Sequence, residues 1–442
     1  MLKFKIMTKK ESTFNQISHS KGLLALSPIV VFLIMYVAVS VIIGDFYKMP
    51  LSIAFIIAVT WALLTTRGKN ITERINIFSN GAANPNIIYM IWIFILAGAF
   101  SGLARGIGAV EVTVDLTLNC LPSWFVLPGL FLVTCFISMS IGTSVGTIVA
   151  LTPFAVELAT VSGGNVAYYV SVVLGGSFFG DNLSFISDTT IAATRSQGVK
   201  MNEKFKTNLR IALPAAIVVL FIYVFNYDST CALDTAAAAT DKPWPLILPY
   251  LVVIATAMMG LNVLIVLLLG IVCSMILAAI YDSCGVMTMC SLMGEGITGM
   301  SDLIIVTLLA AGLLNVISHN GGIHYIIERL TAHVIKGSRG AQLCISLLVA
   351  LVNICTANNT IAILTVGEIA RNIGEKFNVE PSKTASLLDT SSCVVQCIIP
   401  YGAQCMLAAS LAQVAPVAFL PYLYYTWALT AMIIISIILK KR

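Results

Sequence analysis

Three aspartates, Asp181, Asp188 and Asp389, lie within long apolar segments of the 442-residue chain, and Glu157 and Glu368 lie near the ends of two more. An ionisable side chain in membrane hydrocarbon costs roughly 3 kcal/mol or more, so such residues commonly mark an ion path or a substrate site. The alternative for each aspartate is a structural role as a helix cap at a break. Burial favours the neutral, protonated carboxyl, whereas a bound cation favours the carboxylate. One such site can hold either H⁺ or Na⁺, which is sufficient for exchange.

The segment from Gly175 to Thr190 combines glycines, which interrupt a helix, with many oxygen-bearing side chains. Carbonyls freed at a helix break, together with Asn, Ser, Thr and carboxylate oxygens, form the oxygen shell that Na⁺ prefers. Asp181 and Asp188 are seven residues apart, and on an unbroken helix this spacing places them on one face about 10 Å apart. They serve one ion each, or Asp188 exchanges the ion while Asp181 orients the break. We favour Asp188 for the exchange because hydroxyl side chains flank it.

Polar residues also interrupt the apolar spans 124–160 and 342–370, at Gly142–Thr147 and Thr356–Thr360. If both spans are hairpins, their polar tips approach from opposite faces, and two helix N-termini converge near the midplane. The alternative is that these residues only pack helices together. The candidate residues for binding Na⁺ or a proton are Asp181, Asp188, Asn182, Ser184, Ser187, Thr189, Thr143, Ser144, Asn358, Asn359 and Asp389, with Asp181 and Asp188 as the Na⁺ ligands.

Three further ionisable residues, Arg105, His319 and His324, lie near the ends of apolar spans. A role in pH sensing or in binding a substrate carboxylate is one interpretation. The other is that they are interfacial side chains that reach water, and we favour this one.

The composition is that of an integral membrane protein: 58% of the residues are hydrophobic, only 10% are charged, and the mean hydropathy is +0.96. Soluble domains carry about 25% charged residues. The net charge of +5 comes from short basic clusters between apolar runs, which membrane topology explains better than a nucleic-acid partner does.

The eleven cysteines show no zinc or disulfide spacing. The first apolar stretch has no cleavage site and predicts a retained helix.

The apolar spans repeat in the same order in two halves, at a shift of about 214 residues that narrows to about 211 downstream. Met259–Asn262 supplies a turn that divides one long run into two helices. Pro400 predicts a second broken helix beyond Asp389. The spans lie at 23–43, 50–66, 87–104, 124–160, 165–194, 208–227, 244–280, 303–318, 342–370, 384–411 and 415–439.

The distribution of Lys and Arg predicts the topology, because basic residues concentrate on the cytoplasmic side. If spans 124–160 and 342–370 return to their starting face, nearly all Lys and Arg lie inside, with Lys48 and Lys242 outside. Single crossings would place a whole basic cluster outside, so both spans are predicted to be hairpins, and a re-entrant course is favoured. That deciding cluster is Arg195, Lys200, Lys204, Lys206 and Arg210.

Five full crossings per half, an odd number, predict that the halves are inverted and that both termini are cytoplasmic. The predicted fold is an all-α polytopic membrane protein with two inverted repeats, each of five transmembrane helices plus one re-entrant hairpin, and with broken helices at the midplane. The predicted divisions are a cytoplasmic N-terminal segment (1–22), a first repeat (23–227), an extracytoplasmic linker (228–243) and a second repeat (244–442).

The motif Gly180-Asp181, followed by Ser184 and by Ser187-Asp188-Thr189-Thr190, resembles the GD-x-x-SP-x-SDTT signature of the NhaC-type sodium/proton antiporter family. Gly142-Thr143-Ser144 and Gly146-Thr147 resemble that family's other first-half motif. The resemblance covers nearly the whole chain. It implies the ion transporter superfamily architecture, with two inverted repeats that each contain a re-entrant hairpin and a broken helix.

The second half departs further from the family pattern than the first. Phe185 stands where the family has Pro, and Leu388 stands where it has an acid, although Lys383 and Asp389 resemble a family Arg and Asp. Pro400-Tyr401-Gly402-Ala403 replaces a Pro-Trp-Asn-Thr pattern. Related carriers of this architecture include exchangers of organic acids or amino acids, which keeps a second function open.

The expected function is a Na⁺/H⁺ antiporter of the inner (cytoplasmic) membrane that exchanges cytoplasmic sodium for external protons by alternating access. The alternative is a Na⁺- or H⁺-coupled carrier or exchanger of a small organic acid or amino acid, using the hairpin N-termini and Arg105 or His319. A membrane enzyme is disfavoured because no HExxH, GxSxG, P-loop or paired-Cys metal motif occurs. The expected partners are Na⁺, H⁺ and the lipid bilayer, with no cofactor and no nucleic acid; homo-oligomerisation is left open.

Overall fold

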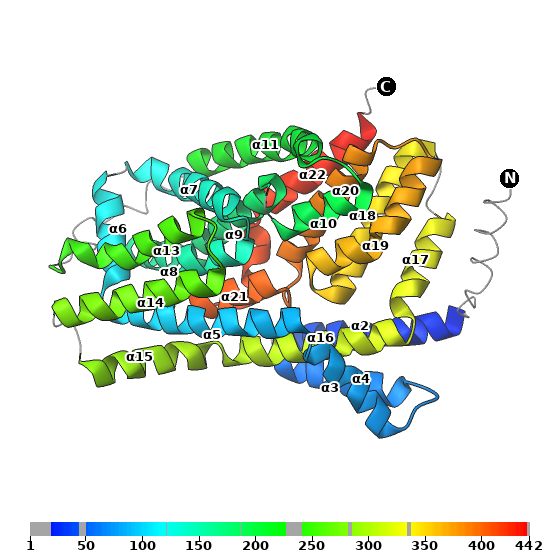
Figure 1. Ribbon diagram of the computed structural model, residues 1–442, viewed down its shortest axis with the longest axis horizontal. Helices are drawn as coiled ribbons and strands as arrows, with labels where there is room; N and C mark the ends of the chain where they lie inside the picture. Colours follow the sequence, from blue (N-terminus) through cyan, green and yellow to red (C-terminus); the bar gives the residue numbers. More distant parts are fainter. Residues whose placement is uncertain are drawn as a thin grey trace.

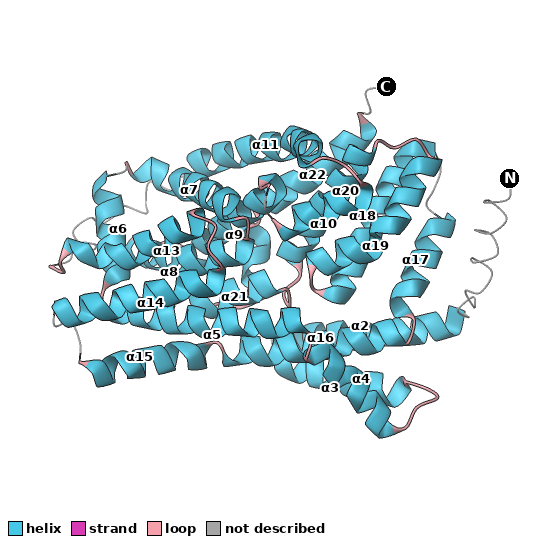
Figure 2. Ribbon diagram, in the orientation of Figure 1, coloured by secondary structure: helices cyan, strands magenta, loops and turns pink. Residues whose placement is uncertain are grey.

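The chain is a bundle of helices in its computed structural model, which describes residues 19–43, 50–120, 122–185, 187–226, 241–281, 285–333 and 337–439. Within these ranges there is no β-strand (Figure 2). The predicted all-helical fold class is therefore confirmed. Residues 1–18 of the predicted N-terminal segment, Lys48, and residues 228–240 of the predicted linker lie outside the described residues.

In the first half, apolar helices are separated by short turns that contain glycine, proline or a capping residue. For example, Asn70 and Glu73 form a reciprocal capping box, and Pro85 occupies the first turn of its helix. The helices are α2 (His19–Ile43), α3 (Leu51–Thr65), α4 (Ile71–Ala82), α5 (Pro85–Gly106), α6 (Ala109–Cys120), the 3₁₀ helix η1 (Ser123–Phe125), α7 (Val126–Ile141), α8 (Ser144–Val161), α9 (Val166–Leu183), α10 (Asp188–Gln197) and α11 (Met201–Phe225).

The second half follows a similar order of elements. Its helices are η2 (Trp244–Ile247), α13 (Leu248–Met258), α14 (Val263–Ile280), α15 (Val286–Gly299), α16 (Ser301–His319), α17 (Gly322–His333), α18 (Gly337–Thr356), α19 (Asn359–Lys376), α20 (Pro381–Ile398), α21 (Ala403–Ala412), η3 (Pro416–Tyr422) and α22 (Tyr424–Ile438). In each half a helix pair with a two-residue turn precedes two helices separated by a short break. We call α7–α8 the first hairpin and α18–α19 the second hairpin. The inverted relation of the halves and the re-entrant course of the hairpins stay predictions.

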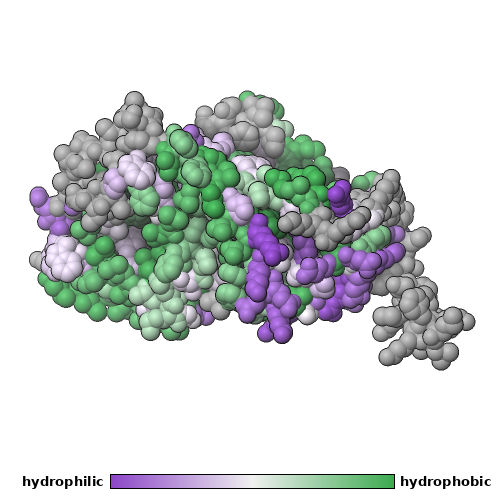
Figure 3. Space-filling view, turned by 90° about the horizontal axis from the view of Figure 1, so that it is seen from above, coloured by the Kyte–Doolittle hydropathy of each residue, from purple (hydrophilic) through white to green (hydrophobic). Residues whose placement is uncertain are grey.

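The outer surface of the bundle is apolar, as a lipid environment requires. Large side chains such as Trp92, Phe221 and Ile276 are more than half exposed. In the part of the chain that the structure describes, eight helices are long and apolar enough to cross a membrane, or nine if the bent pair η3–α22 is one span. The visible face in Figure 3 is mainly hydrophobic in its left and middle parts, and hydrophilic residues gather toward the right. The chain is a multi-pass membrane protein.

One helical segment was not expected from the sequence. The structure forms α15 over residues 286–299, directly before α16, and together they make an apolar run from Val286 to His319. The sequence-based spans omit this segment because Glu295 and Asp302 interrupt its apolar pattern. Close packing explains its stability: Gly296 lies against Gly98 of α5, where an added Cβ would overlap the backbone.

The two halves interlock around the broken helices in the middle of the bundle (Figure 1). The second hairpin contacts α10 of the first half through α19, and the first hairpin contacts α21 of the second half through α8. α9 packs between α7 and α8 and also contacts α20 and α22, and α11 packs on α20 and α22. Residues from both halves therefore meet where the helices break.

Candidate ion-binding site

The predicted break in the first broken helix lies between Leu183, where α9 ends, and Asp188, where α10 begins. Ser184 and Ser187 have extended backbone there, so the chain leaves the helix in the middle of a buried segment. Close packing on α7 holds α9 in place: Ser138 Oγ donates a hydrogen bond of 2.6 Å to the Ser177 carbonyl. A Cβ at Gly180 would overlap Ser138, so this approach requires glycine.

Asp181 lies in the last turn of α9 with its side chain only 4% exposed. The backbone N–H of Ser144, the first residue of α8, donates to Asp181 Oδ1 at 3.0 Å. Because a helix N-terminus carries a partial positive charge, α8 stabilises the carboxylate form. Gly142 makes this approach possible: it ends α7 at φ +74° and turns the chain into the first hairpin's tip. Among the described residues, Asp181 forms no ion pair with a lysine or arginine.

A chain of side-chain amides connects this aspartate site to the second hairpin. Gln404 Nε2 of α21 donates to Ser144 Oγ at 3.2 Å, and Gln396 Nε2 of α20 donates to Gln404 Oε1 at 2.9 Å. Gln396 Nε2 also donates to the Ala357 carbonyl at 3.0 Å. Ala357 forms the second hairpin's turn with a left-handed backbone, φ +47°. The two hairpin tips are thus linked through residues on both sides of the second helix break.

A second polar cluster is centred on Lys204 of α11 and Asp389 of α20, whose side chains are 1% and 0% exposed. Lys204 Nζ lies 2.6 Å from Asp389 Oδ2, 2.6 Å from Thr190 Oγ1 and 3.0 Å from the Asn182 carbonyl. Asn208 Nδ2 donates to the same Asn182 carbonyl and to Asp389 Oδ2, both at 2.7 Å. The break after α9 frees this carbonyl from helix bonding, so the cluster depends on the break.

The structure places Asp188 differently from the expectation for a buried exchanging group. Its side chain is exposed at the first turn of α10, whereas Asp181 is buried. The prediction that both aspartates are buried is wrong for Asp188, because the break changes the chain direction and helical spacing does not extend across it. Which aspartate exchanges the ion stays a prediction.

The remaining predicted oxygen ligands fall into two groups. Two of them, Thr143 and Asn358, are partly exposed. The others are buried: Asn182, Ser184, Ser187, Thr189, Ser144 and Asn359. Asn182 Nδ2 donates to the Tyr425 hydroxyl at 3.2 Å, and the Ser187 and Thr189 hydroxyls are 2.9 Å apart. In the second hairpin, Asn358 caps α19 by accepting from the Ile361 N–H at 3.0 Å, a structural role different from the helix packing that the sequence analysis considered. Asn359 Nδ2 lies 4.0 Å from Cys393 Sγ of α20.

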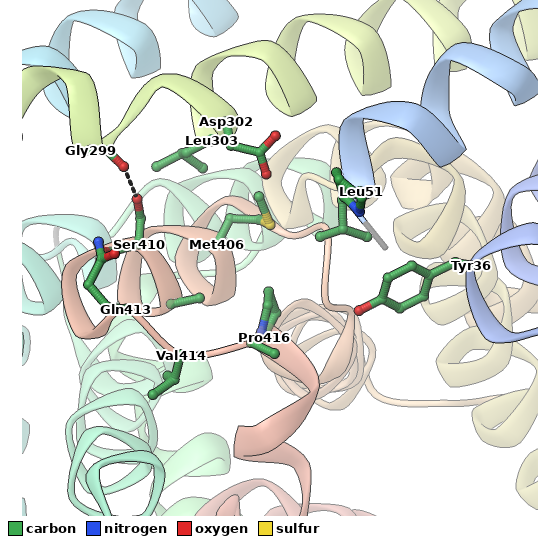
Figure 4. A pocket seen from close by; sticks show the side chains of 13 residues that line it. Tyr36, Leu51, Gly299, Asp302, Leu303, Met406, Ser410, Gln413, Val414 and Pro416 are labelled. Carbon is green, nitrogen blue, oxygen red and sulfur yellow. Dashed lines mark hydrogen bonds between the residues drawn. The ribbon is translucent and has the colours of Figure 1, made fainter. Parts of the chain in front are cut away.

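The other ionisable residues that the sequence singled out lie outside both polar clusters. Arg105, His319 and Glu368 are exposed, and Glu157 and His324 are partly buried. Arg105 lines a pocket of about 290 Å³ that also contains Glu295 of α15. A neighbouring pocket of about 200 Å³ is lined by Tyr36, Asp302, Met406 and Ser410, with Ser410 Oγ bonded to the Gly299 carbonyl at 2.9 Å (Figure 4).

Sequence reasoning left out Lys204, Asn208, Gln396 and Gln404, and it noted Thr190 only as a neighbour of Asp188. It counted Lys204 only as a member of the basic cluster on the cytoplasmic side and did not predict that this side chain is fully buried. The sequence did contain a signal for the burial of Lys204, because it lies at helical spacing with other residues on the buried face of α11. These residues are Asn208, Ile211, Ala215 and Val219. The two glutamines carry no comparable signal, because an uncharged polar residue in a membrane helix is also typical of helix packing.

The sequence profile of the Na⁺/H⁺ antiporter family matches residues 5–226 and 234–441, nearly the entire chain. The chain belongs to the Na⁺/H⁺ antiporter family. The resemblance seen in the Gly-Asp and Ser-Asp-Thr-Thr motifs is thereby confirmed. Family membership makes the chain a secondary antiporter and implies Na⁺ and H⁺ as the transported ions.

Individual proteins are similar to this chain at low identity. The Na(+)/H(+) antiporter NhaC of Bacillus subtilis (strain 168) is 24% identical over 397 residues, which cover 81% of this chain and 85% of that protein. The malate-2H(+)/Na(+)-lactate antiporter of the same organism is 21% identical over 423 residues, covering 88% and 89%. Among solved structures, Neisseria gonorrhoeae MtrF is similar, with 15% identity, coverage of 99% and 98%, and a TM-score of 0.42.

Proposed function

We propose that this family member exchanges cytoplasmic Na⁺ for external H⁺ across the inner membrane, with Asp181 as the group that holds either ion. The observation that carries the proposal is the environment of Asp181: it is buried, it has no basic partner among the described residues, and it faces the N-terminus of α8. A carboxylate in that position needs a counter-charge, which Na⁺ supplies, or it takes up a proton. Because both ions use one carboxylate, they compete.

The neighbouring oxygens provide candidate ligands for a bare cation. Ser144 Oγ belongs to the residue whose N–H bonds Asp181, and Asn182 Oδ1 is buried without a hydrogen-bond partner in the described chain. Asp188 remains a candidate for the entry path, where an exposed carboxylate attracts cations without holding them away from water. Movement of the hairpin tips, joined by Gln396 and Gln404, would then alternate access to Asp181.

A second candidate function, exchange of a small organic acid, draws on two observations. One is the relative named a malate-2H(+)/Na(+)-lactate antiporter. The other is the pocket beside Arg105, whose guanidinium can bind a carboxylate. The Na⁺/H⁺ proposal is preferred because Asp181 lies in a buried break, whereas Arg105 is exposed.

Proteoliposomes with an imposed pH gradient test both functions. Na⁺, Li⁺, K⁺ and then a panel of organic acids and amino acids are added while lumenal pH is recorded. We expect Na⁺ or Li⁺ alone to dissipate the gradient, Asp181→Asn to abolish this response, and the exposed control Asp302→Asn to retain it. Dissipation by organic solutes only, or full cation response in Asp181→Asn, contradicts the proposal.

A further inference from the structure

The geometry around Lys204 points to a second cation site, which the lysine ammonium itself occupies in this conformation. We infer that Asp389, Thr190 and the Asn182 carbonyl form a shell for one monovalent cation, and that Lys204 is a built-in competitor that keeps Na⁺ out of it. The inference rests on the proposed function, because it concerns a neighbour of the Asp181 site. It assigns Lys204 a positioning and selectivity role rather than a transport role.

The contacts of the ammonium are those of a bound cation. Three oxygens from three elements surround Nζ at 2.6 to 3.0 Å: the Asp389 carboxylate of α20, the Thr190 hydroxyl of α10 and the Asn182 carbonyl at the end of α9. One of these oxygens is charged and two are neutral, the mixture expected for a hard monovalent cation. The ammonium has three N–H donors and these three oxygens accept them, so the same oxygens are available as ligands when another monovalent cation takes the place of the ammonium.

Oxygens without donors provide an independent observation. Asp389 Oδ1 and Asn208 Oδ1 belong to two residues joined by a hydrogen bond, and both oxygens are buried without a hydrogen-bond partner in the described chain. Asn208 and Asp389 are both 0% exposed, so neither oxygen faces the surface. Buried acceptors are normally satisfied by a protein group, an ordered water or an ion, so these two oxygens are further ligands that a cation in this shell would use.

The charge balance explains why the two cations exclude one another. The Lys204 ammonium and the Asp389 carboxylate together are neutral, and a Na⁺ added to the same shell would leave an uncompensated buried positive charge. If the ammonium is withdrawn or replaced by a neutral group, the carboxylate is left unpaired, and Na⁺ then competes with a proton for it. Lys204 thus directs Na⁺ to Asp181 and away from Asp389.

Equilibrium binding of radioactive Na⁺ to purified full-length protein, at fixed pH with choline as the balancing ion, tests the inference. We compare the wild type with Asp181→Asn, Lys204→Gln, the double variant of both, and the double variant with Asp389→Asn added. Glutamine is chosen because it keeps a donor for the Thr190 and Asn182 oxygens without the charge. Lys206→Gln, an exposed lysine on the same helix, is the matched control.

The proposed function and the second cation site predict changes in Na⁺ binding for different variants. Loss of binding in Asp181→Asn tests the proposed function alone. Lys204→Gln should bind about one additional Na⁺ per chain, binding should return in the Asp181→Asn/Lys204→Gln variant, and Asp389→Asn should remove it again. Equal binding in the wild type and Lys204→Gln, or a gain that survives Asp389→Asn, overturns the second cation site whatever Asp181→Asn shows.

If Lys204→Gln is too unstable for binding measurements, thermal unfolding of the same proteins tests the second cation site. Na⁺, but not choline, should raise the melting temperature of Lys204→Gln in a concentration-dependent way, and the effect should disappear with Asp389→Asn. A Lys204→Gln protein that Na⁺ does not stabilise contradicts the inference.

Discussion

The buried ion pair between Lys204 and Asp389 makes a quantitative stability prediction. In Na⁺-free buffer, Lys204→Met removes the ammonium from three oxygens and leaves Asp389 buried with only the Asn208 amide as a partner. Breaking a buried pair on one side costs about 3–5 kcal/mol, because the remaining charge is uncompensated. Replacing both residues, in Lys204→Met/Asp389→Leu, should cost much less, because no buried charge remains.

Reversible unfolding of the detergent-solubilised protein, followed by circular dichroism, measures these free energies in a double-mutant cycle. The coupling energy between the two residues should be about 2 kcal/mol or more, at the upper end of values for contacting side chains. The control Lys206→Met, an exposed residue on the same helix, should stay within about 0.5 kcal/mol of the wild type. A Lys204→Met protein as stable as this control, or a coupling energy near zero, would refute the reasoning that Lys204 and Asp389 form a buried ion pair whose partners stabilise each other.

Three further outcomes follow from the described contacts. Asp188→Asn should reduce Na⁺-driven proton flux in proteoliposomes less than Asp181→Asn does, because Asp188 is exposed; the reverse ranking would return the exchanging role to it. Gln404→Leu removes the side-chain link between the hairpin tips, and it should slow transport while lowering stability by only about 1–2 kcal/mol; unchanged turnover would show that the link is dispensable. Gly296→Ala should lower stability by about 1–3 kcal/mol, because its Cβ overlaps the backbone of α5, whereas Gly294→Ala on the same helix meets nothing and should not; equal melting temperatures would contradict this packing.

Much of the architecture was predictable because membrane hydrocarbon restricts the backbone so strongly. Apolar runs of sufficient length predict the helices, and glycines among polar residues predict the break near Gly180. The turn at Gly142 was also predictable from the sequence, since glycine takes the left-handed conformation that ends α7. The corresponding turn at Ala357 uses a residue that rarely adopts φ +47°, so local propensity did not indicate it.

The candidate site was only partly predictable. Asp181 was among the candidates, but its ranking against Asp188 depended on the direction in which the chain leaves the break. Lys204 was predicted only as one member of the cytoplasmic basic cluster, because the topology argument counts charge along the sequence and ignores helical phase. Its pairing with Asp389, 185 residues away, depends on how α11 packs against α20.

The sequence by itself determined that this is a helical membrane antiporter with acidic and polar residues at broken helices, because the cost of placing such groups in hydrocarbon limits what they can be. Only the tertiary structure decided which carboxylates are unpaired. Asp181 faces the N–H of Ser144 without a basic partner among the described residues, whereas Asp389 is neutralised by Lys204. The physical reason is that pairing depends on distances of about 3 Å between elements far apart in sequence, and such distances are set when the helices pack.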